Sequence, residues 1–115
     1  MTKSAIATAF SKGAFDQIYD YLSEHARWEV LGENTFENKL AIIKQCSEVA
    51  AYFKSVTTHF EVHQVIEEKN KIAVTGIAEF IRNGQRVSFV HGCDIYLFNG
   101  QGQIQSITSY CIQLK

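Results

Sequence analysis

The stretch Cys93-Asp94-Ile95-Tyr96-Leu97-Phe98-Asn99-Gly100-Gln101-Gly102-Gln103-Ile104 decides the fold of this 115-residue chain. It places one carboxylate, Asp94, inside an apolar, strand-like run that ends in a glycine-rich turn. A carboxylate in apolar surroundings costs free energy unless it is paired, hydrogen-bonded or protonated. Asp94 is therefore either a satisfied structural residue or an acid that lines a pocket.

Turn signals divide the second half of the chain into strands. The turns fall at Glu68-Lys69-Asn70-Lys71, at Asn83-Gly84 and at Asn99-Gly100-Gln101-Gly102, between runs rich in Val, Ile, Thr, Phe and Tyr. Asn-Gly between such runs is a strong hairpin signal, because both residues tolerate positive φ. The pattern predicts four antiparallel strands at about 57–68, 71–82, 86–98 and 103–114.

The first half has helical periodicity. Apolar residues recur at spacings of three and four from Phe10 to Leu22, and Gly13 divides this region into two short predicted helices. The segment 27–31 is a predicted short strand, and residues 40–53 form a third predicted helix, capped by Thr35 or Asn38. The sequence therefore predicts an α+β fold, with about three N-terminal helices packed on an antiparallel sheet.

The predicted strand at 86–98 is apolar on both faces. Val90 and Tyr96 share one face with Asp94, and Phe89 and Ile95 lie on the other. An antiparallel sheet with one solvated face should alternate apolar and polar residues, so both faces should be covered. The helices can cover one face, and we expect a second copy of the chain to cover the other in a twofold homodimer.

Length and composition favour a single domain over residues 1–115. Lys and Arg total 11 against 12 for Asp and Glu, with no run of like charge, so we expect no nucleic-acid partner. No segment is apolar for long enough to span a membrane, so we expect no membrane association. Three separated cysteines, Cys46, Cys93 and Cys111, predict reduced thiols and a cytoplasmic location.

We expect no metal and no cofactor. His59 and His63 have the spacing of two ligands on one helical turn, but they lie in a predicted strand, where four residues span about 13 Å. No Cys-x-x-Cys motif, nucleophile elbow or phosphate-binding glycine loop is present in the sequence.

Three segments resemble one family. They are Gly13 with Phe15, Ile18 and Leu22; Trp28-Glu29-Val30-Leu31-Gly32 with Phe36 and Lys39; and the stretch 93–104. Together with the element order, they resemble the nuclear transport factor 2-like superfamily, in the branch of ketosteroid isomerases and SnoaL-like polyketide cyclases. The resemblance implies a cystatin-like cone, in which helices close over a strongly curved antiparallel sheet.

The resemblance also implies a site. Asp94 matches the ketosteroid isomerase aspartic acid that stays protonated in an apolar pocket and donates a hydrogen bond to the substrate. The general base of that family falls at Glu29 or Val30, depending on the direction of counting, and its oxyanion-hole tyrosine falls near Ile6, which has no hydroxyl group. The implied activity is cofactor-free proton transfer next to a carbonyl, in the manner of an isomerase or cyclase. A non-catalytic dimeric binding or association module is the alternative.

Several candidate residues keep a structural alternative. Asp94 could be an acid, or could be hydrogen-bonded internally to Tyr96, Tyr110 or a nearby backbone amide. Glu29 could be a base, or could face solvent or pair with neighbours of Arg27, and strand alternation puts it on the face opposite Trp28. His63 could be a proton shuttle in the cavity or a surface residue. The side chains proposed to line a pocket for a small apolar or carbonyl-containing ligand are Trp28, Tyr19, Tyr52, Tyr96 and His63.

Overall fold

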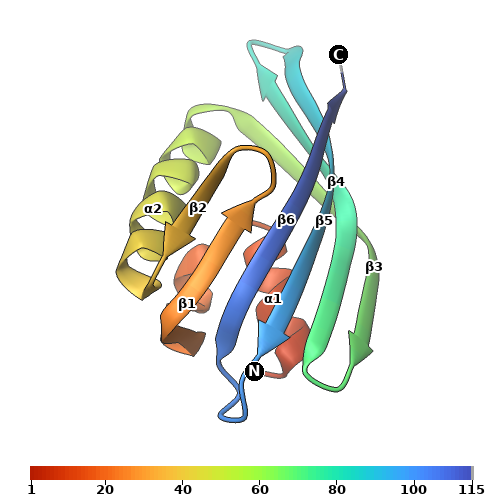
Figure 1. Cartoon of the computed structure of the whole chain (residues 1–115). Helices are drawn as coiled ribbons and strands as arrows, with labels where there is room; N and C mark the ends of the chain where they lie inside the picture. Colours follow the sequence, from red (N-terminus) through yellow and green to blue (C-terminus); the bar gives the residue numbers. More distant parts are fainter. Residues whose placement is uncertain (115) are drawn as a thin grey trace.

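A curved six-stranded sheet carries two α-helices on one face in the computed structural model, which describes residues 1–114 (Figure 1). The strand order is β2-β1-β6-β5-β4-β3. Strands β1 and β6 run parallel, and the other neighbouring pairs run antiparallel. The elements are α1 Lys3–Ser11, β1 Leu22–Val30, β2 Asn34–Glu37, α2 Lys39–Ser55, β3 Thr57–Glu68, β4 Lys71–Arg82, β5 Gln85–Phe98 and β6 Ile104–Leu114.

The α+β class and the four long strands are confirmed, with strand bounds that differ from the predicted ones by at most one residue. Asn83 and Gly84 both have positive φ, 53° and 75°, so the β4–β5 hairpin turns where the Asn-Gly pair predicts. The start of α2 is also explained by the sequence. The side chain of Asn38, one of the two predicted caps, accepts a hydrogen bond from the Ala41 amide at 3.0 Å.

The structure has two α-helices among residues 1–114, one fewer than predicted. The region predicted as a second helix forms two single 3₁₀ turns, Phe15–Gln17 and Tyr19–Tyr21, and Leu22 already begins β1. Apolar residues three apart, such as Phe15 and Ile18, fit a 3₁₀ turn as well as an α-helix, so periodicity over so few residues does not separate the two.

The sheet also differs from the prediction at one edge. It is mixed, because β1 pairs in parallel with β6, and it gains the short strand β2. Strand β1 begins at Leu22, earlier than the predicted segment 27–31. The prediction missed its first half, Leu22-Ser23-Glu24-His25, because these residues are mostly polar. Pairing between segments about 80 residues apart leaves no local signal in the sequence, so it could not be predicted from turns and periodicity.

The core lies between the helices and the concave face of the sheet. Its largest fully buried side chains include Tyr96, Phe98, Ile18, Leu22 and Ile42. Gly76 on β4 allows β3 to bend close to it, because a Cβ atom there would lie 2.2 Å from the Glu61 carbonyl oxygen. A register shift between Val62 and Gln64 marks the same bend in β3.

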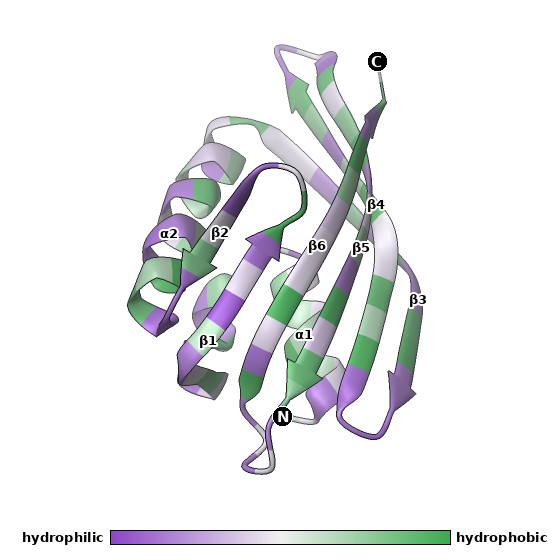
Figure 2. Cartoon of the chain, viewed as in Figure 1, coloured by the Kyte–Doolittle hydropathy of each residue, from purple (hydrophilic) through white to green (hydrophobic). Residues whose placement is uncertain are grey.

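The convex face of the sheet carries exposed apolar side chains on its central strands. Ile112 and Tyr110 on β6 are 66% and 45% exposed, and Val87 on β5 is 46% exposed. Figure 2 shows hydrophobic residues spread along β4, β5 and β6. Both helices lie on the other side of the sheet (Figure 1).

Neither helix within residues 1–114 is long and apolar enough to span a membrane.

Candidate functional site

A cavity of about 400 Å³ opens between the concave face of the sheet and the C-terminal halves of the two helices. Cavities of this size suit one small organic molecule. Six aromatic residues line this cavity: Phe10, Phe15, Trp28, Phe53, Phe60 and Phe80. Polar side chains from different elements also reach the cavity: Ser11, Lys12, Glu33, Gln45, Glu61, Asp94, Ser109 and Gln113.

Two glycines form part of the cavity floor. Gly76 on β4 and Gly92 on β5 are directly paired, and Gly92 is paired on its other side with Cys111 of β6. A Cβ atom built at Gly92 would meet no atom of the described chain within 4 Å. The floor is therefore bare backbone two residues before Asp94, on the same face of the strand, so a ligand can lie against the sheet there.

Asp94 projects from β5 into this cavity and is hydrogen-bonded to the end of α1. Ser11, the last residue of α1, donates from Oγ to Asp94 Oδ2 at 2.7 Å. The hydroxyl group of Tyr96 lies 2.6 Å from the same Ser11 Oγ. The Tyr96 side chain is fully buried, so its polar end is held against Ser11 inside the core.

Ser109 approaches Asp94 from the neighbouring strand. It is the residue directly opposite Asp94 in the β5–β6 pairing, and its side chain is buried. The indole Nε1 of Trp28 donates to Ser109 Oγ at 2.9 Å. Trp28 is held in place by edge-to-face contact with Phe10, with ring centres 5.1 Å apart. The parallel β1–β6 pairing positions this tryptophan beside Ser109.

The surroundings of Asp94 act on its pKa in opposite directions. Burial raises the pKa of the carboxyl group above its ordinary value, and hydrogen bonds from Ser109, Ser11 and Tyr96 lower it, with burial the larger effect. Burial and the nearby Asp94 also raise the pKa of Tyr96 well above its ordinary value. The carboxyl is thus the group in the cavity whose protonation is shifted toward neutral pH.

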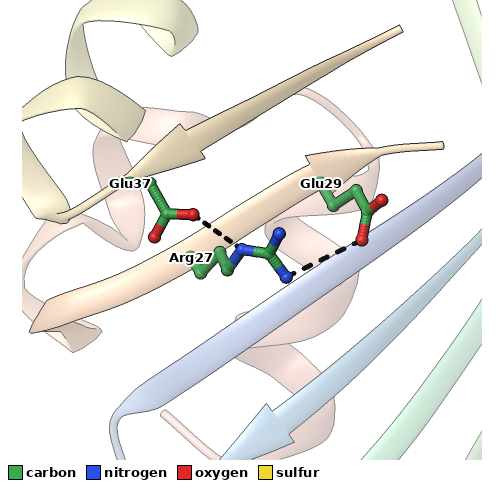
Figure 3. Close-up of polar contacts among 3 residues, drawn as sticks. All are labelled: Arg27, Glu29 and Glu37. Atoms are coloured by element: carbon green, nitrogen blue, oxygen red, sulfur yellow. Dashed lines mark hydrogen bonds and ion pairs between the residues drawn. The ribbon is translucent and has the colours of Figure 1, made fainter. Parts of the chain in front are cut away.

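Glu29 lies away from the cavity. It projects from the convex face of β1, where its Oε1 is 3.8 Å from Nη1 of Arg27, and Arg27 Nε donates to Glu37 Oε1 at 2.8 Å (Figure 3). Trp28, its neighbour in the sequence, points the other way into the cavity wall. The two residues occupy opposite faces of β1, as strand alternation requires.

The other predicted ligand-binding residues are divided. Trp28 lines the cavity, and Tyr96 lies behind Asp94, connected to it through Ser11. Tyr19, Tyr52 and His63 are outside the cavity lining of the described chain. Tyr19 packs at the edge of the core, Tyr52 is 42% exposed beside Phe80, and His63 lies on β3 with its Nε2 3.6 Å from Glu61 Oε1.

Sequence reasoning missed Ser11, Ser109 and Gly92. Ser11 carries no local signal, since a serine at the end of a helix is ordinary. The hairpin at residues 99–102 brings this part of β6 opposite Asp94, but a register shift between Leu97 and Phe98 moves the pairing by one residue, so the turn alone does not identify Ser109. Among residues 1–114, no three His, Cys, Asp or Glu side chains come together in a way that could hold a metal ion.

Comparisons with known proteins agree with this architecture. The family model described as a SnoaL-like domain matches residues 4–107. A structure of an NTF2-like protein of unknown function from Cytophaga hutchinsonii is 30% identical to this chain, with a TM-score of 0.85 and 94% of each chain covered. No curated protein sequence matches this chain.

More distant structures share the fold. An LEH-like epoxide hydrolase from M. tuberculosis is 14% identical, with a TM-score of 0.69, and the match covers 96% of this chain and 84% of that one. The epoxide hydrolase/cyclase-like enzyme SalBIII, described as having a role in pyran ring formation in the polyether salinomycin, is 17% identical, with a TM-score of 0.74 and coverages of 96% and 90%. The family match and the 30% identical structure identify this chain as a member of the SnoaL-like domain family, within the nuclear transport factor 2-like superfamily.

Proposed function

We propose that this protein binds a small, mostly apolar, carbonyl-containing molecule in the aromatic cavity, and that Asp94 transfers a proton next to the carbonyl group. The observation that carries the proposal is an open cavity with one carboxyl group at its inner wall, held by Ser11. The other carboxyl groups that line the cavity, Glu33 and Glu61, belong to exposed residues. The activities named for SalBIII and the mycobacterial epoxide hydrolase are of the same general kind, small-molecule chemistry in this fold.

The proposed chemistry uses the chain's own residues. Asp94 removes a proton from the carbon next to the carbonyl, which leaves an enolate, and the protonated carboxyl then returns the proton to a different carbon or to oxygen. Migration of a double bond or attack of the enolate on a second carbonyl would follow from the shape of the bound molecule. Since Glu29 faces away from the cavity, the proposal assigns both proton removal and proton return to Asp94.

Proton exchange into deuterated water tests the first step without knowledge of the natural substrate. We would incubate 2-tetralone and 1-indanone, two bicyclic ketones, with the protein and follow loss of the protons next to the carbonyl by NMR. The wild type should accelerate exchange, Asp94→Asn should not, and Asp16→Asn, which changes an exposed carboxylate, should behave as wild type. Equal rates for wild type and Asp94→Asn would refute a role of Asp94 in proton transfer on such ketones.

Binding is measured separately by fluorescence of Trp28, the single tryptophan of the chain, which lines the cavity. Quenching or a spectral shift on adding the same ketones would report occupancy of the cavity. Binding without exchange would support a binding module that has no catalytic activity.

The exposed apolar residues of the convex face support a second proposal, association of two copies through this face. Ile112 of β6 is 66% exposed and is paired with His91 of β5. Light scattering after size-exclusion chromatography should give twice the chain mass, and Ile112→Glu should lower it to one. Leu40→Glu, at a residue 76% exposed on α2, is the matched control and should leave the dimer intact. A monomeric wild type at micromolar concentration would contradict the dimer.

A further inference from the structure

We infer that two hydrogen-bond chains, one of Tyr96 with Ser11 and one of Trp28 with Ser109, direct hydroxyl protons at Asp94 and so make it the proton acceptor of the cavity. The inference deepens the proposed function, because it states which protonation form of Asp94 meets the ligand. It differs from the protonated, donating aspartic acid that the family resemblance implies. Trp28, Ser109, Tyr96 and Ser11 are positioning residues in this scheme.

The first chain is directed by the limited hydrogen-bonding capacity of a hydroxyl. Ser11 has one proton, and Asp94 Oδ2 lies 2.7 Å from its Oγ. If that proton goes to Asp94, the Tyr96 hydroxyl, 2.6 Å from Ser11, donates to Ser11. In the reverse order, Ser11 donates to Tyr96, and the Tyr96 hydroxyl, which also hydrogen-bonds to Asp94 and lowers its pKa, donates to the carboxyl group. Both orders direct one hydroxyl proton of the Ser11–Tyr96 pair at Asp94.

The second chain has no ambiguity at its start. An indole N–H is a donor only, so Ser109 Oγ accepts from Trp28 Nε1 at 2.9 Å. This leaves the Ser109 proton to be donated elsewhere. Asp94 is the residue directly across from Ser109 on β5, and Ser109 acts on it as a hydrogen-bond donor that lowers its pKa.

The two chains reach one carboxyl group from different elements. Ser11 reaches it from α1 and Ser109 from β6, and the donors behind them, Tyr96 and Trp28, are both buried. Hydrogen bonds from donors favour the ionised form of a carboxyl group. Asp94 also lines the cavity, so a bound molecule should present a C–H or O–H proton to Asp94, and its carbonyl oxygen should lie elsewhere.

Other titratable groups around Asp94 must be controlled. Tyr96 lies on the same strand and Cys111 on β6. Lys12 directly after α1, Glu33 in the β1–β2 turn and Glu61 on β3 also line the cavity. Burial raises the pKa of Tyr96 and of Cys111, so these two groups are neutral in the range where Asp94 titrates. Titration of Glu33 and Glu61 can be separated from that of Asp94, because each carboxyl carbon gives its own NMR signal.

The experiment measures the acid dissociation constant of Asp94 from its carboxyl ¹³C signal in a set of variants. Ser109→Ala and Ser11→Ala remove direct donors and should each weaken the acidity of Asp94 about tenfold. Trp28→Phe leaves Ser109 in place but releases its proton, and Tyr96→Phe removes one hydroxyl of the Ser11–Tyr96 pair. They should weaken it about threefold, although Trp28 makes no hydrogen bond to Asp94 in the described chain.

A double-mutant cycle separates a relay from general loosening of the site. If Trp28 acts through Ser109, then Trp28→Phe should have no further effect in the Ser109→Ala background. Phe36→Leu is the packing control. The centre of the Phe36 ring lies 5.3 Å from the centre of the Trp28 ring, and Phe36 forms no hydrogen bond to Ser109. This substitution should leave the Asp94 titration unchanged.

The inference is overturned if Trp28→Phe and Tyr96→Phe leave the titration of Asp94 unchanged, or if the Trp28 and Ser109 effects are additive. Should Trp28→Phe fail to fold, Tyr96→Phe tests the other chain with its ring retained. The readout needs no substrate. Coupling in the NMR titration together with absent ketone exchange would refute the proposed catalysis and leave the hydrogen-bond chains standing.

Discussion

Paired glycines on the cavity floor should respond to alanine with opposite signs. Gly76 of β4 and Gly92 of β5 are directly paired, so they lie at the same level of the sheet and on the same face, toward the cavity. At Gly92, a Cβ atom meets no atom of the described chain within 4 Å, and its φ is not positive. At Gly76, the same atom would lie 2.2 Å from the Glu61 carbonyl oxygen.

The magnitudes follow from these two environments. Gly92→Ala restricts the unfolded chain without a clash and should stabilise the protein by about 0.5–1 kcal/mol. Gly76→Ala forces β3 away from β4 and should destabilise it by about 1–3 kcal/mol. A larger residue at Gly92 projects into the cavity. Gly92→Leu should therefore retain stability while it excludes ligands from the space beside Asp94.

Urea unfolding, followed by Trp28 fluorescence and circular dichroism, measures both effects. With a slope of about 1.5 kcal/mol per molar urea, Gly92→Ala should raise the midpoint by about 0.3–0.7 M. Gly76→Ala should lower it by about 0.7–2 M. Shifts of the same sign in the two variants, or loss of stability in Gly92→Ala, would refute the account of an open floor at Gly92 and a closed one at Gly76.

Three further predictions concern protonation, thiol access and capping. Burial raises the pKa of Asp94 in the folded state above its unfolded value of about 3.9. Folding stability should therefore fall as the pH rises from the unfolded pKa through the folded pKa. Thermal melts over this pH range should show a smaller decline for Asp94→Asn than for the wild type. Burial raises the pKa of the Cys46 thiol to about 12, so a thiol reagent should label Cys111 in the native protein and Cys46 only after unfolding; native labelling of Cys46 would contradict its buried position. Asn38 caps α2 with a φ of 80°, so Asn38→Ala should cost about 1–2 kcal/mol in urea unfolding and Asn38→Gly only a few tenths; equal losses would argue against the cap.

Most of the fold could be predicted from local signals in the sequence. Strands β4 and β5 each lie between two turn signals, and β3 and β6 each adjoin one, so their bounds at these turns depended on Asn83-Gly84 and similar short segments and on no distant contact. Strand alternation likewise placed Asp94 and Tyr96 on one face and separated Trp28 from Glu29. These are consequences of backbone geometry with a period of two, which persists in any sheet.

The candidate site was less predictable, because it depends on contacts between distant segments. Ser11 and Asp94 are 83 positions apart, and Trp28 and Ser109 are 81 apart. The first contact needs the docking of α1 across β5, and the second needs the parallel pairing of β1 with β6. Neither arrangement is encoded in a short motif, so serines with no distinguishing local sequence become partners of Asp94 only once the topology is known.

The same dependence on topology has an energetic consequence. A carboxyl group in an apolar cavity is destabilising without donors, and here those donors arrive from α1 and β6, backed by β5 and β1. The site is therefore complete only when α1, β1, β5 and β6 are all in place. Any fold of this sequence that lost the β1–β6 pairing would leave Ser109 without Trp28 and Asp94 with a weaker donor. The two hydrogen-bond chains thus favour the mixed sheet over a purely antiparallel one. The apolar pattern of the sequence alone does not favour either sheet.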